Sequence, residues 1–177
     1  MKLPFGSDQP GRKEKSGMPG KRPGKEGFTF IELVIAMFIV GILATIAIPS
    51  YTKYLEKDKE ATAISDIKAI EAQLKGIMMD NPDALPADLS AINFGKFLSL
   101  VDPWGNPYRY LPIYGHPENL HNVRKDHNLH PINSDFDMYS MGPDGESNLP
   151  LTNQKSRDDI IRANDGAFVG KASTYDP

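Results

Sequence analysis

Hydrophobic residues fill one uninterrupted stretch of the chain, residues 28–48, in which Glu32 is the single charged residue. The stretch holds roughly 21 residues and would extend about 32 Å as an α-helix, which is enough to cross the hydrocarbon core of a bilayer. It therefore predicts a transmembrane helix. A carboxylate inside such a helix is costly without a partner. The apolar surroundings of Glu32 suggest that this partner comes from outside the helix.

A second hydrophobic pattern follows Pro49 and has the period of an amphipathic helix. Because Pro49 has no N–H and crowds the carbonyl of Thr45, we expect a kink or a melted turn between Gly41 and Pro49. The helix should end at Asn81, since Pro82 disfavours helical backbone in the residue before it. We expect the charged side chains mostly opposite the apolar stripe, which should pack on a sheet. The apolar positions are Tyr51, Tyr54, Leu55, Ile64, Ile67, Ile70, Leu74, Ile77 and Met78.

Shorter patterns typical of turns and strands make up the rest of the chain. Residues 85–100 predict a short helix or an irregular cover over the sheet. Residues 102–108 combine Asp, Pro, Gly and Asn as a turn does, and a strand is expected at 108–111. Residues 135–141 alternate apolar and polar side chains and predict another strand, which the turn at 142–145 ends.

Composition changes where the apolar stretch begins. Residues 1–27 hold seven Lys and Arg against three Asp and Glu, a net charge of about +4. They predict a disordered basic leader, which the positive-inside rule keeps in the cytoplasm. The rest of the chain has 13 basic and 20 acidic residues. This acidic balance disfavours nucleic acid as a partner and suits the binding of cations.

Two further features concern the compartment. A secretory signal peptide also places a basic region before an apolar one. The apolar run here is too long for that alternative and ends in Ile48-Pro49-Ser50-Tyr51, without an Ala-x-Ala exit. The chain has no cysteine. A domain on the oxidising side of a membrane must then be stabilised by a metal or by its neighbours.

The residues from Lys25 to Leu33, Lys-Glu-Gly-Phe-Thr-Phe-Ile-Glu-Leu, resemble the processing site of type IV prepilins and of the pseudopilins of type II secretion. The Gly-Phe junction, the glutamate, the apolar helix and Pro49 all stand at the family's spacing. The resemblance implies cleavage between Gly27 and Phe28 by an inner-membrane prepilin peptidase, followed by N-methylation of Phe28. The leader is longer than most in the family.

This resemblance supplies a partner for Glu32. Cleavage would create an α-amino group on Phe28 that is mostly cationic at neutral pH. In a helical assembly, the Glu32 carboxylate of one subunit can pair with the Phe28 ammonium of its neighbour inside an apolar bundle, where the attraction is weakly screened. The pair would set the axial register between subunits. The alternative is that Glu32 simply lies close enough to the helix end to reach the membrane interface.

The Asp-Pro-Trp-Gly-Asn-Pro-Tyr run at 102–108 resembles the start of the sheet in the major pseudopilin of type II secretion. Trp104 by itself could form a carbohydrate platform or a core residue, and we favour burial of the indole under the turn. Many type IV pilins close their C-terminal region with a disulfide. The lack of cysteine therefore points towards the pseudopilins.

A Tyr-Ser-x-Gly-x-Asp-Gly run at 139–145 and a later Asp-Asp-Ile resemble the calcium loop of the major pseudopilin. Hard oxygen donors from a flexible loop are what calcium requires, and the ion could replace the missing disulfide. The insert at 146–157 is longer and less glycine-rich than in the family. The alternative is a solvated acidic turn with a capped short helix. The ligands implied are the main-chain carbonyl of Met141 and the carboxylates of Asp144, Asp158 and Asp159, with Asp165 as a substitute and Asp158 as the capping residue of the alternative.

All histidines lie in the polar stretch at 113–133, which raises the hypothesis of a zinc site. Their spacing matches no helical or hairpin pair of ligands, and we do not favour zinc. No nucleophile with a base, no Gly-x-Ser-x-Gly and no His-Glu-x-x-His occurs. A membrane-tethered enzyme or metal-binding protein is therefore a remote alternative. The histidines are His116, His121, His127 and His130.

We predict an α+β, pilin-like fold, in which a long N-terminal α-helix with a membrane half and an amphipathic half packs on a small antiparallel β-sheet of three or four strands. The expected organisation is a removable cytoplasmic leader at 1–27 and a transmembrane and filament-core helix at 28–49. The amphipathic continuation covers 50–81, and a globular α+β domain with the calcium-type loop covers 82–177.

The function implied by the resemblance is structural and not enzymatic. The chain would be a subunit of a helical pseudopilus of type II secretion, which drives the export of folded proteins. Its expected partners are further copies of itself, minor pseudopilins, the prepilin peptidase and the inner-membrane assembly platform. The expected location is the bacterial inner membrane, with a single pass, a cytoplasmic N-terminus and a periplasmic C-terminal domain. A type IV pilus subunit is the close alternative.

Overall fold

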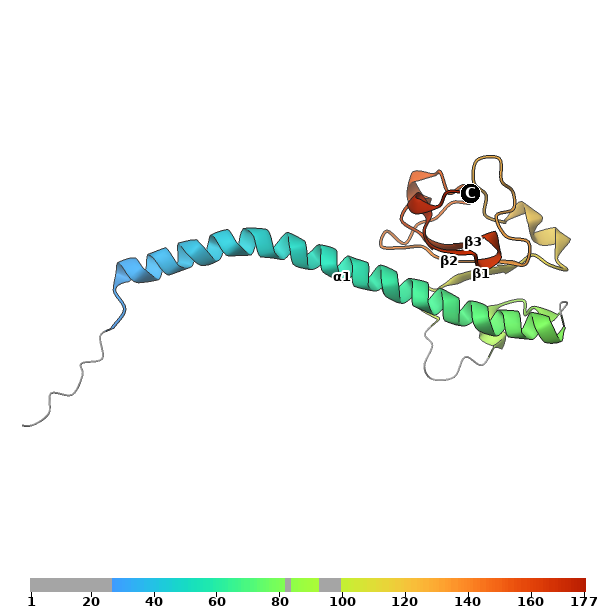
Figure 1. Cartoon of the computed structure of the whole chain (residues 1–177), viewed down its shortest axis with the longest axis horizontal. Coiled ribbons are helices and arrows are strands. Elements are labelled where there is room, and N and C mark those ends of the chain that lie inside the picture. Colours follow the sequence, from blue (N-terminus) through green and yellow to red (C-terminus); the bar gives the residue numbers. More distant parts are fainter. Residues whose placement is uncertain (1–26, 82–83, 93–99) are drawn as a thin grey trace, which may run out of the picture. The chain divides into compact units, whose positions relative to one another are not determined.

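A computed structural model of the 177-residue chain describes residues 27–81, 84–92 and 100–177 (Figure 1). Residues 1–26 of the expected leader at 1–27, and residues 93–99 of the expected cover at 85–100, lie outside the described residues. The chain divides into two compact units, Met1–Ala44 and Thr45–Pro177.

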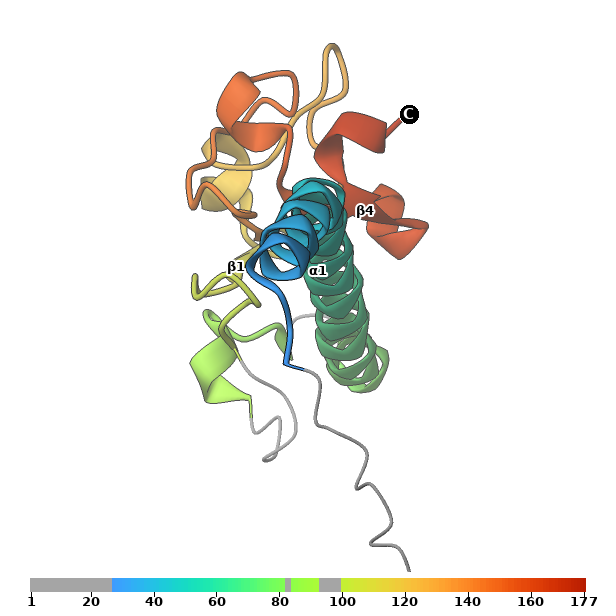
Figure 2. The ribbon, with the colours of Figure 1, turned by 90° about the vertical axis from the view of Figure 1, so that its left-hand side faces the viewer.

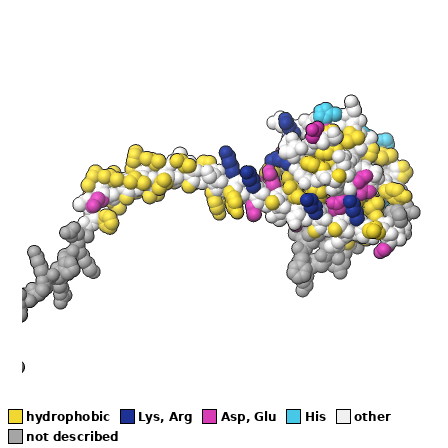
Figure 3. Space-filling view, in the orientation of Figure 1, with side chains coloured by type: hydrophobic (Ala, Val, Ile, Leu, Met, Phe, Trp, Pro, Cys, Tyr) yellow, Lys and Arg dark blue, Asp and Glu magenta, His cyan; other side chains and the backbone are white. Residues whose placement is uncertain are grey.

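The long helix predicted from the two hydrophobic patterns is a single element, α1 (Phe30–Asp80, 51 residues). It ends at Asp80, within one residue of the end expected at Asn81. The N–H of Asn81 donates the last helical hydrogen bond, to the carbonyl of Ile77 at 3.0 Å. Among the described residues, α1 is the helix that is long and apolar enough to cross a membrane. In the first unit its large hydrophobic side chains are exposed (Figure 3).

The region from Gly41 to Pro49 stays α-helical, so the melted turn expected there is absent from the single chain. Proline removes one backbone donor, but hydroxyl groups add bonds in the same turns. Ser50 Oγ donates to the carbonyl of Ile46 at 3.0 Å, and Thr52 Oγ1 donates to the carbonyl of Pro49 at 3.0 Å. The loss of one backbone donor at Pro49 therefore does not unwind the helix.

The second unit contains an antiparallel sheet of four strands in the order β1-β2-β3-β4, which confirms the predicted fold class. Tyr139 of β2 pairs with Arg109 on one side and with Ile161 on the other. Short 3-10 helices connect the strands. The strands are β1 (Arg109–Pro112), β2 (Phe136–Ser140), β3 (Ile160–Ala163) and β4 (Phe168–Lys171). The 3-10 helices are Leu89–Ala91, Pro117–His121, Gln154–Ser156, Asn164–Gly166 and Ala172–Thr174.

The apolar stripe of α1 packs on one face of this sheet, as predicted. A view along the helix places β1 and β4 on its two sides (Figure 2). The core between helix and sheet includes Ala63, Ile67, Ile70, Leu74, Tyr108, Phe136, Met138 and Ile160. A second cluster contains Ile132, Leu151, Ile161, Ala163 and Ala172. Each fully buried aliphatic side chain contributes about 1.5–3 kcal/mol.

The sequence predicts the charged side chains of α1 mostly opposite the apolar stripe, and some of the acidic ones also contact the domain. Four of them accept hydrogen bonds from the loops and strands of the domain, because a carboxylate at the rim of the apolar stripe can reach a donor across the interface. The pairs are Trp104 Nε1 to Glu56 (2.9 Å), Lys171 Nζ to Glu60 (2.8 Å), Tyr108 OH to Asp66 (2.8 Å) and Arg162 Nε to Glu71 (3.1 Å).

The predicted turn at 102–108 is built around Asp102, which is buried. Its Oδ1 accepts the N–H groups of Trp104 (3.1 Å) and Asn106 (2.8 Å), and its Oδ2 accepts the hydroxyl of Ser140 at the end of β2 (2.5 Å). Trp104 is partly buried and packs against the core. The structure therefore favours the core interpretation of this side chain over the carbohydrate platform.

Candidate functional site

The Gly27–Phe28 junction lies just before α1, in residues without helical structure. Phe28 is 91% exposed. The helix is capped by Thr29 and Glu32: the Thr29 N–H and hydroxyl both donate to Glu32 Oε2, at 2.8 and 2.6 Å, and the Glu32 N–H donates to Thr29 Oγ1 at 3.3 Å. This reciprocal pattern is a capping box. The peptide bond that a peptidase would cut is thus outside the helix. The first turn of the helix is capped by side chains that lie after this bond.

The capping box corrects one expectation. Glu32 was expected to find its partner only outside its own helix, but Thr29 provides two donors within the same chain. The spacing Thr-x-x-Glu before an apolar run is the signal in the sequence that indicates this cap. Both bonds end on Oε2, and a carboxylate accepts bonds at both oxygens. Glu32 can therefore serve the cap and a cationic group of a neighbouring subunit together.

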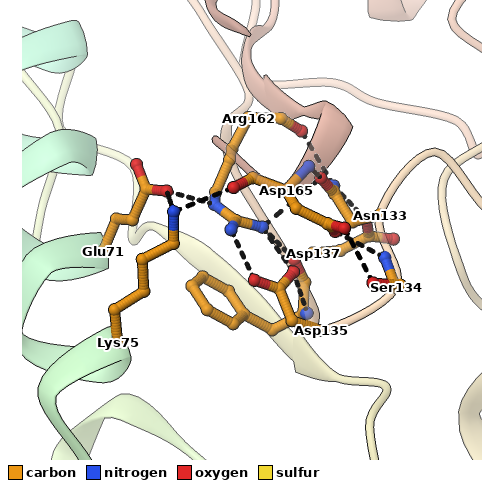
Figure 4. A network of polar contacts seen from close by, with 9 residues as sticks. Glu71, Lys75, Asn133, Ser134, Asp135, Asp137, Arg162 and Asp165 are labelled. Atoms are coloured by element: carbon orange, nitrogen blue, oxygen red, sulfur yellow. Dashed lines mark hydrogen bonds and ion pairs between the residues drawn. The ribbon is translucent and has the colours of Figure 1, made fainter. Parts of the chain in front are cut away.

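A buried polar network joins α1 to the sheet (Figure 4). At its centre, the guanidinium of Arg162 on β3 forms two parallel bonds to Asp135, at 2.7 and 2.6 Å, and donates to Glu71 on α1 at 3.1 Å. Its plane also lies 4.0 Å from the ring centre of Phe136. Lys75 bridges Glu71 (2.8 Å) and the carbonyl of Asp165 (2.9 Å). We call these residues the Arg162 network.

The four predicted calcium ligands lie in the loop between β2 and β3. Asp159 is fully buried, and its Oδ2 accepts from Arg124 Nη2 at 2.6 Å and from Ser147 Oγ at 2.6 Å. Burial raises the pKa of Asp159 to about 6, although Arg124 acts in the opposite direction. Burial also raises the pKa of Asp158, and the charge of Asp144 adds to that effect. The charge of Asp158 in turn contributes to the raised pKa of Asp159.

The turn that carries Met141 approaches Asp158 closely. Gly142 has a φ of +65°, and a Cβ atom there would lie 2.6 Å from the Asp158 carbonyl oxygen. Only glycine permits both the conformation and the contact. The substitute ligand Asp165 lies elsewhere, because its carboxylate accepts the N–H (2.6 Å) and the hydroxyl (2.7 Å) of Ser134.

No three His, Cys, Asp or Glu side chains in the described ranges are grouped so as to hold a metal ion. This includes the histidines considered for zinc. His116 Nδ1 lies 2.9 Å from the carboxylate of Glu118, and His127 Nδ1 lies 3.0 Å from that of Asp126. Each of these contacts is local in the chain and gives no reason to invoke zinc.

Comparisons with known proteins bear on the N-terminal junction and on the whole chain. Residues 22–48 match the family model described as the prokaryotic N-terminal methylation motif. The chain is 31% identical over 143 residues to the type II secretion system core protein G of Pseudomonas aeruginosa, which covers 71% of this chain and 89% of that protein. The core protein G of Aeromonas hydrophila is 31% identical over 140 residues, covering 70% and 86% of the two chains.

A pilin is also similar over a shorter stretch. The type IV major pilin protein PilA of Myxococcus xanthus is 40% identical over 88 residues, which is 50% of this chain and 37% of that protein. No solved structure matches the chain.

Proposed function

Because the chain belongs to the type II secretion system core protein G family, we propose that it is a structural subunit of a helical pseudopilus that acts in the export of folded proteins. The observation that carries this proposal is the N-terminal arrangement. A non-helical Gly27–Phe28 junction precedes a capped helix, and the apolar surface of this helix is exposed in the single chain. Such a surface requires lipid or other subunits.

The proposed cycle follows from these properties. The prepilin peptidase cuts after Gly27 and Phe28 is N-methylated, while the helix holds the subunit in the inner membrane with its C-terminal domain in the periplasm. The assembly platform and the minor pseudopilins then bring subunits together, and the apolar parts of α1 form the core of the filament. In that core, the Glu32 carboxylate pairs with the Phe28 amine of a neighbour. The role is architectural, without a catalytic step.

Two variants of Glu32 separate its two contacts. Glu32→Gln keeps an oxygen that can accept the bonds from Thr29 but removes the charge, whereas Glu32→Ala removes both. We expect both variants to be inserted into the membrane and cleaved at Gly27, as shown by mass spectrometry of the N-terminus, and both to fail to form filaments. If Glu32→Gln assembled as well as the wild type, the cap alone would explain the residue and the charge pair would be refuted.

The similarity to PilA over 88 residues favours a type IV pilus subunit as the second candidate. Deletion of the gene separates the two functions. Loss of exoprotein release with twitching motility intact supports the secretion pseudopilus, and the converse supports the pilus. Long surface fibres on overexpression would not decide, because major pseudopilins can form them too.

We further propose that the domain binds calcium through Asp144, Asp158, Asp159 and the main-chain carbonyl of Met141. The three carboxylates are not grouped around one point in the described part of the chain, so the ion would have to draw them together. Two features fit a divalent cation: the mutual influence of the carboxylates, and Asp159 Oδ1, which is buried and has no hydrogen-bond partner in the described part of the chain. Calcium would supply positive charge to carboxylates that repel one another.

Calorimetric titration of the mature chain in detergent micelles with calcium tests this proposal. Asp158→Asn should weaken binding at least tenfold. Glu146→Gln is the matched control, because Glu146 lies in the same loop, pairs with Lys155 at 2.5 Å and is not a proposed ligand. Equal affinities of the two variants, or no binding by the wild type, would contradict the calcium proposal.

A further inference from the structure

The loop between β2 and β3 packs against a buried cation, Arg124, which lies in the segment before β2. The side chain of Arg124 is buried, and Nη2 donates to Asp159 Oδ2 at 2.6 Å while Nη1 donates to the hydroxyl of Ser147. Ser147 Oγ donates in turn to the same Asp159 oxygen, at 2.6 Å. The guanidinium also stacks on Tyr139 of β2, with 4.2 Å between its carbon and the ring centre. One side chain thus joins β2 to the middle and the end of the loop.

The backbone beside Arg124 is fixed at the same place. The N–H of Lys125 donates to the carbonyl of Leu149 at 3.1 Å, and the N–H of Leu151 donates to the carbonyl of Lys125 at 2.9 Å. Arg124 N–H donates to the buried carboxylate of Asp137 at 2.5 Å. The segment at 146–157 therefore rests on a strand-like pairing with the segment that carries Arg124.

A buried guanidinium can hold such a loop more permanently than an ion that exchanges with solvent. Arginine stays charged at every relevant pH, and its planar fork keeps its donors at fixed angles. Asp159 Oδ2 accepts a hydrogen bond from Arg124. The negative charge of Asp159 is therefore compensated in the absence of a metal ion. The remaining carboxylates, Asp144 and Asp158, lie nearer the solvent.

We propose that Arg124 is the resident cation of the loop at 141–159, and that the loop keeps its fold when calcium is withdrawn. Calcium bound at the outer carboxylates and at the free oxygen of Asp159 adds to the loop but does not create it. The subunit is therefore able to fold in a calcium-poor compartment. This inference does not depend on the pseudopilus function, because it concerns the folded monomer.

The test uses the mature chain in detergent micelles, with and without a calcium chelator. Thermal unfolding reports global stability, and hydrogen exchange at the amides of Lys125 and Leu151 reports the loop. The wild type should change by less than about 2 °C on chelation, with both amides still protected. Arg124→Met should lower the Tm by about 10 °C and expose these amides, since it leaves a buried carboxylate without its partner.

Arg157→Met is the matched control, because Arg157 is an arginine within the loop at 141–159 and its side chain is exposed. It should behave as the wild type. If Arg124→Met does not fold, the double variant Arg124→Met/Asp159→Asn should recover folded protein, since no unpaired charge remains. Exposure of the loop amides in the chelated wild type would overturn the proposal. Equal behaviour of Arg124→Met and Arg157→Met would overturn it as well.

Discussion

Replacement of Arg162 by methionine is the sharpest perturbation of the link between α1 and the sheet. The guanidinium is 1% exposed and donates five hydrogen bonds, two of them to Asp135, one to Glu71, one to the carbonyl of Phe136 and one to Asn133. Methionine fills part of the space but donates none. Two carboxylates that are each 7% exposed would then lie beside an apolar side chain.

The size of the effect follows from these unpaired charges. Removal of one partner of a buried ion pair costs about 3–5 kcal/mol, against a total stability of about 5–15 kcal/mol for a typical domain. In a chain of this length, the loss corresponds to a fall in Tm of roughly 6–20 °C. Arg162→Lys keeps the charge but loses the two parallel bonds to Asp135, and should fall between the wild type and Arg162→Met.

Urea unfolding of the mature chain in micelles measures these differences, with Arg157→Met as the exposed control. The reasoning would be refuted if Arg162→Met lay within about 0.5 kcal/mol of Arg157→Met, the range of ordinary surface substitutions. If the α1 amides of Arg162→Met were as protected from hydrogen exchange as those of the wild type, Arg162 would not stabilise the packing of the helix on the sheet.

Two further predictions concern the same interface. Trp104→Phe loses the hydrogen bond to Glu56 and should lower the free energy of unfolding by about 1 kcal/mol. Unfolding is followed by circular dichroism, because the variant has no tryptophan left for fluorescence. An unchanged free energy of unfolding would mean that the bond contributes nothing. Gly166→Ala should cost at least about 1–3 kcal/mol, since Gly166 has a φ of +91° and a Cβ there would lie 1.7 Å from Glu71 Oε1. Gly76→Ala, in α1 with open space around it, should instead stabilise by about 1 kcal/mol, and equal effects of the two alanines would contradict this account.

Local periodicity explains which elements were predictable. The helix was expected to reach Asn81 and ends at Asp80, and the strand expected at 135–141 is Phe136–Ser140. In contrast, no strand was assigned to β3. All four of its residues are buried, with Ile160 in the cluster under α1 and Ile161 and Ala163 in the second cluster. A strand covered on both faces shows no alternation of polar and apolar residues, so its sequence has no strand period.

The N-terminal end was determined by the sequence, because everything that defines it is local: the Gly27–Phe28 junction, the apolar run and the Thr29 cap of Glu32 lie within a few helical turns. The polar contacts of the domain were decided by the tertiary structure. Arg162 is 91 residues from Glu71 and Arg124 is 35 residues from Asp159. Nothing in the spacing of these residues indicates the pairing, since it exists only once tertiary packing has removed water from both partners.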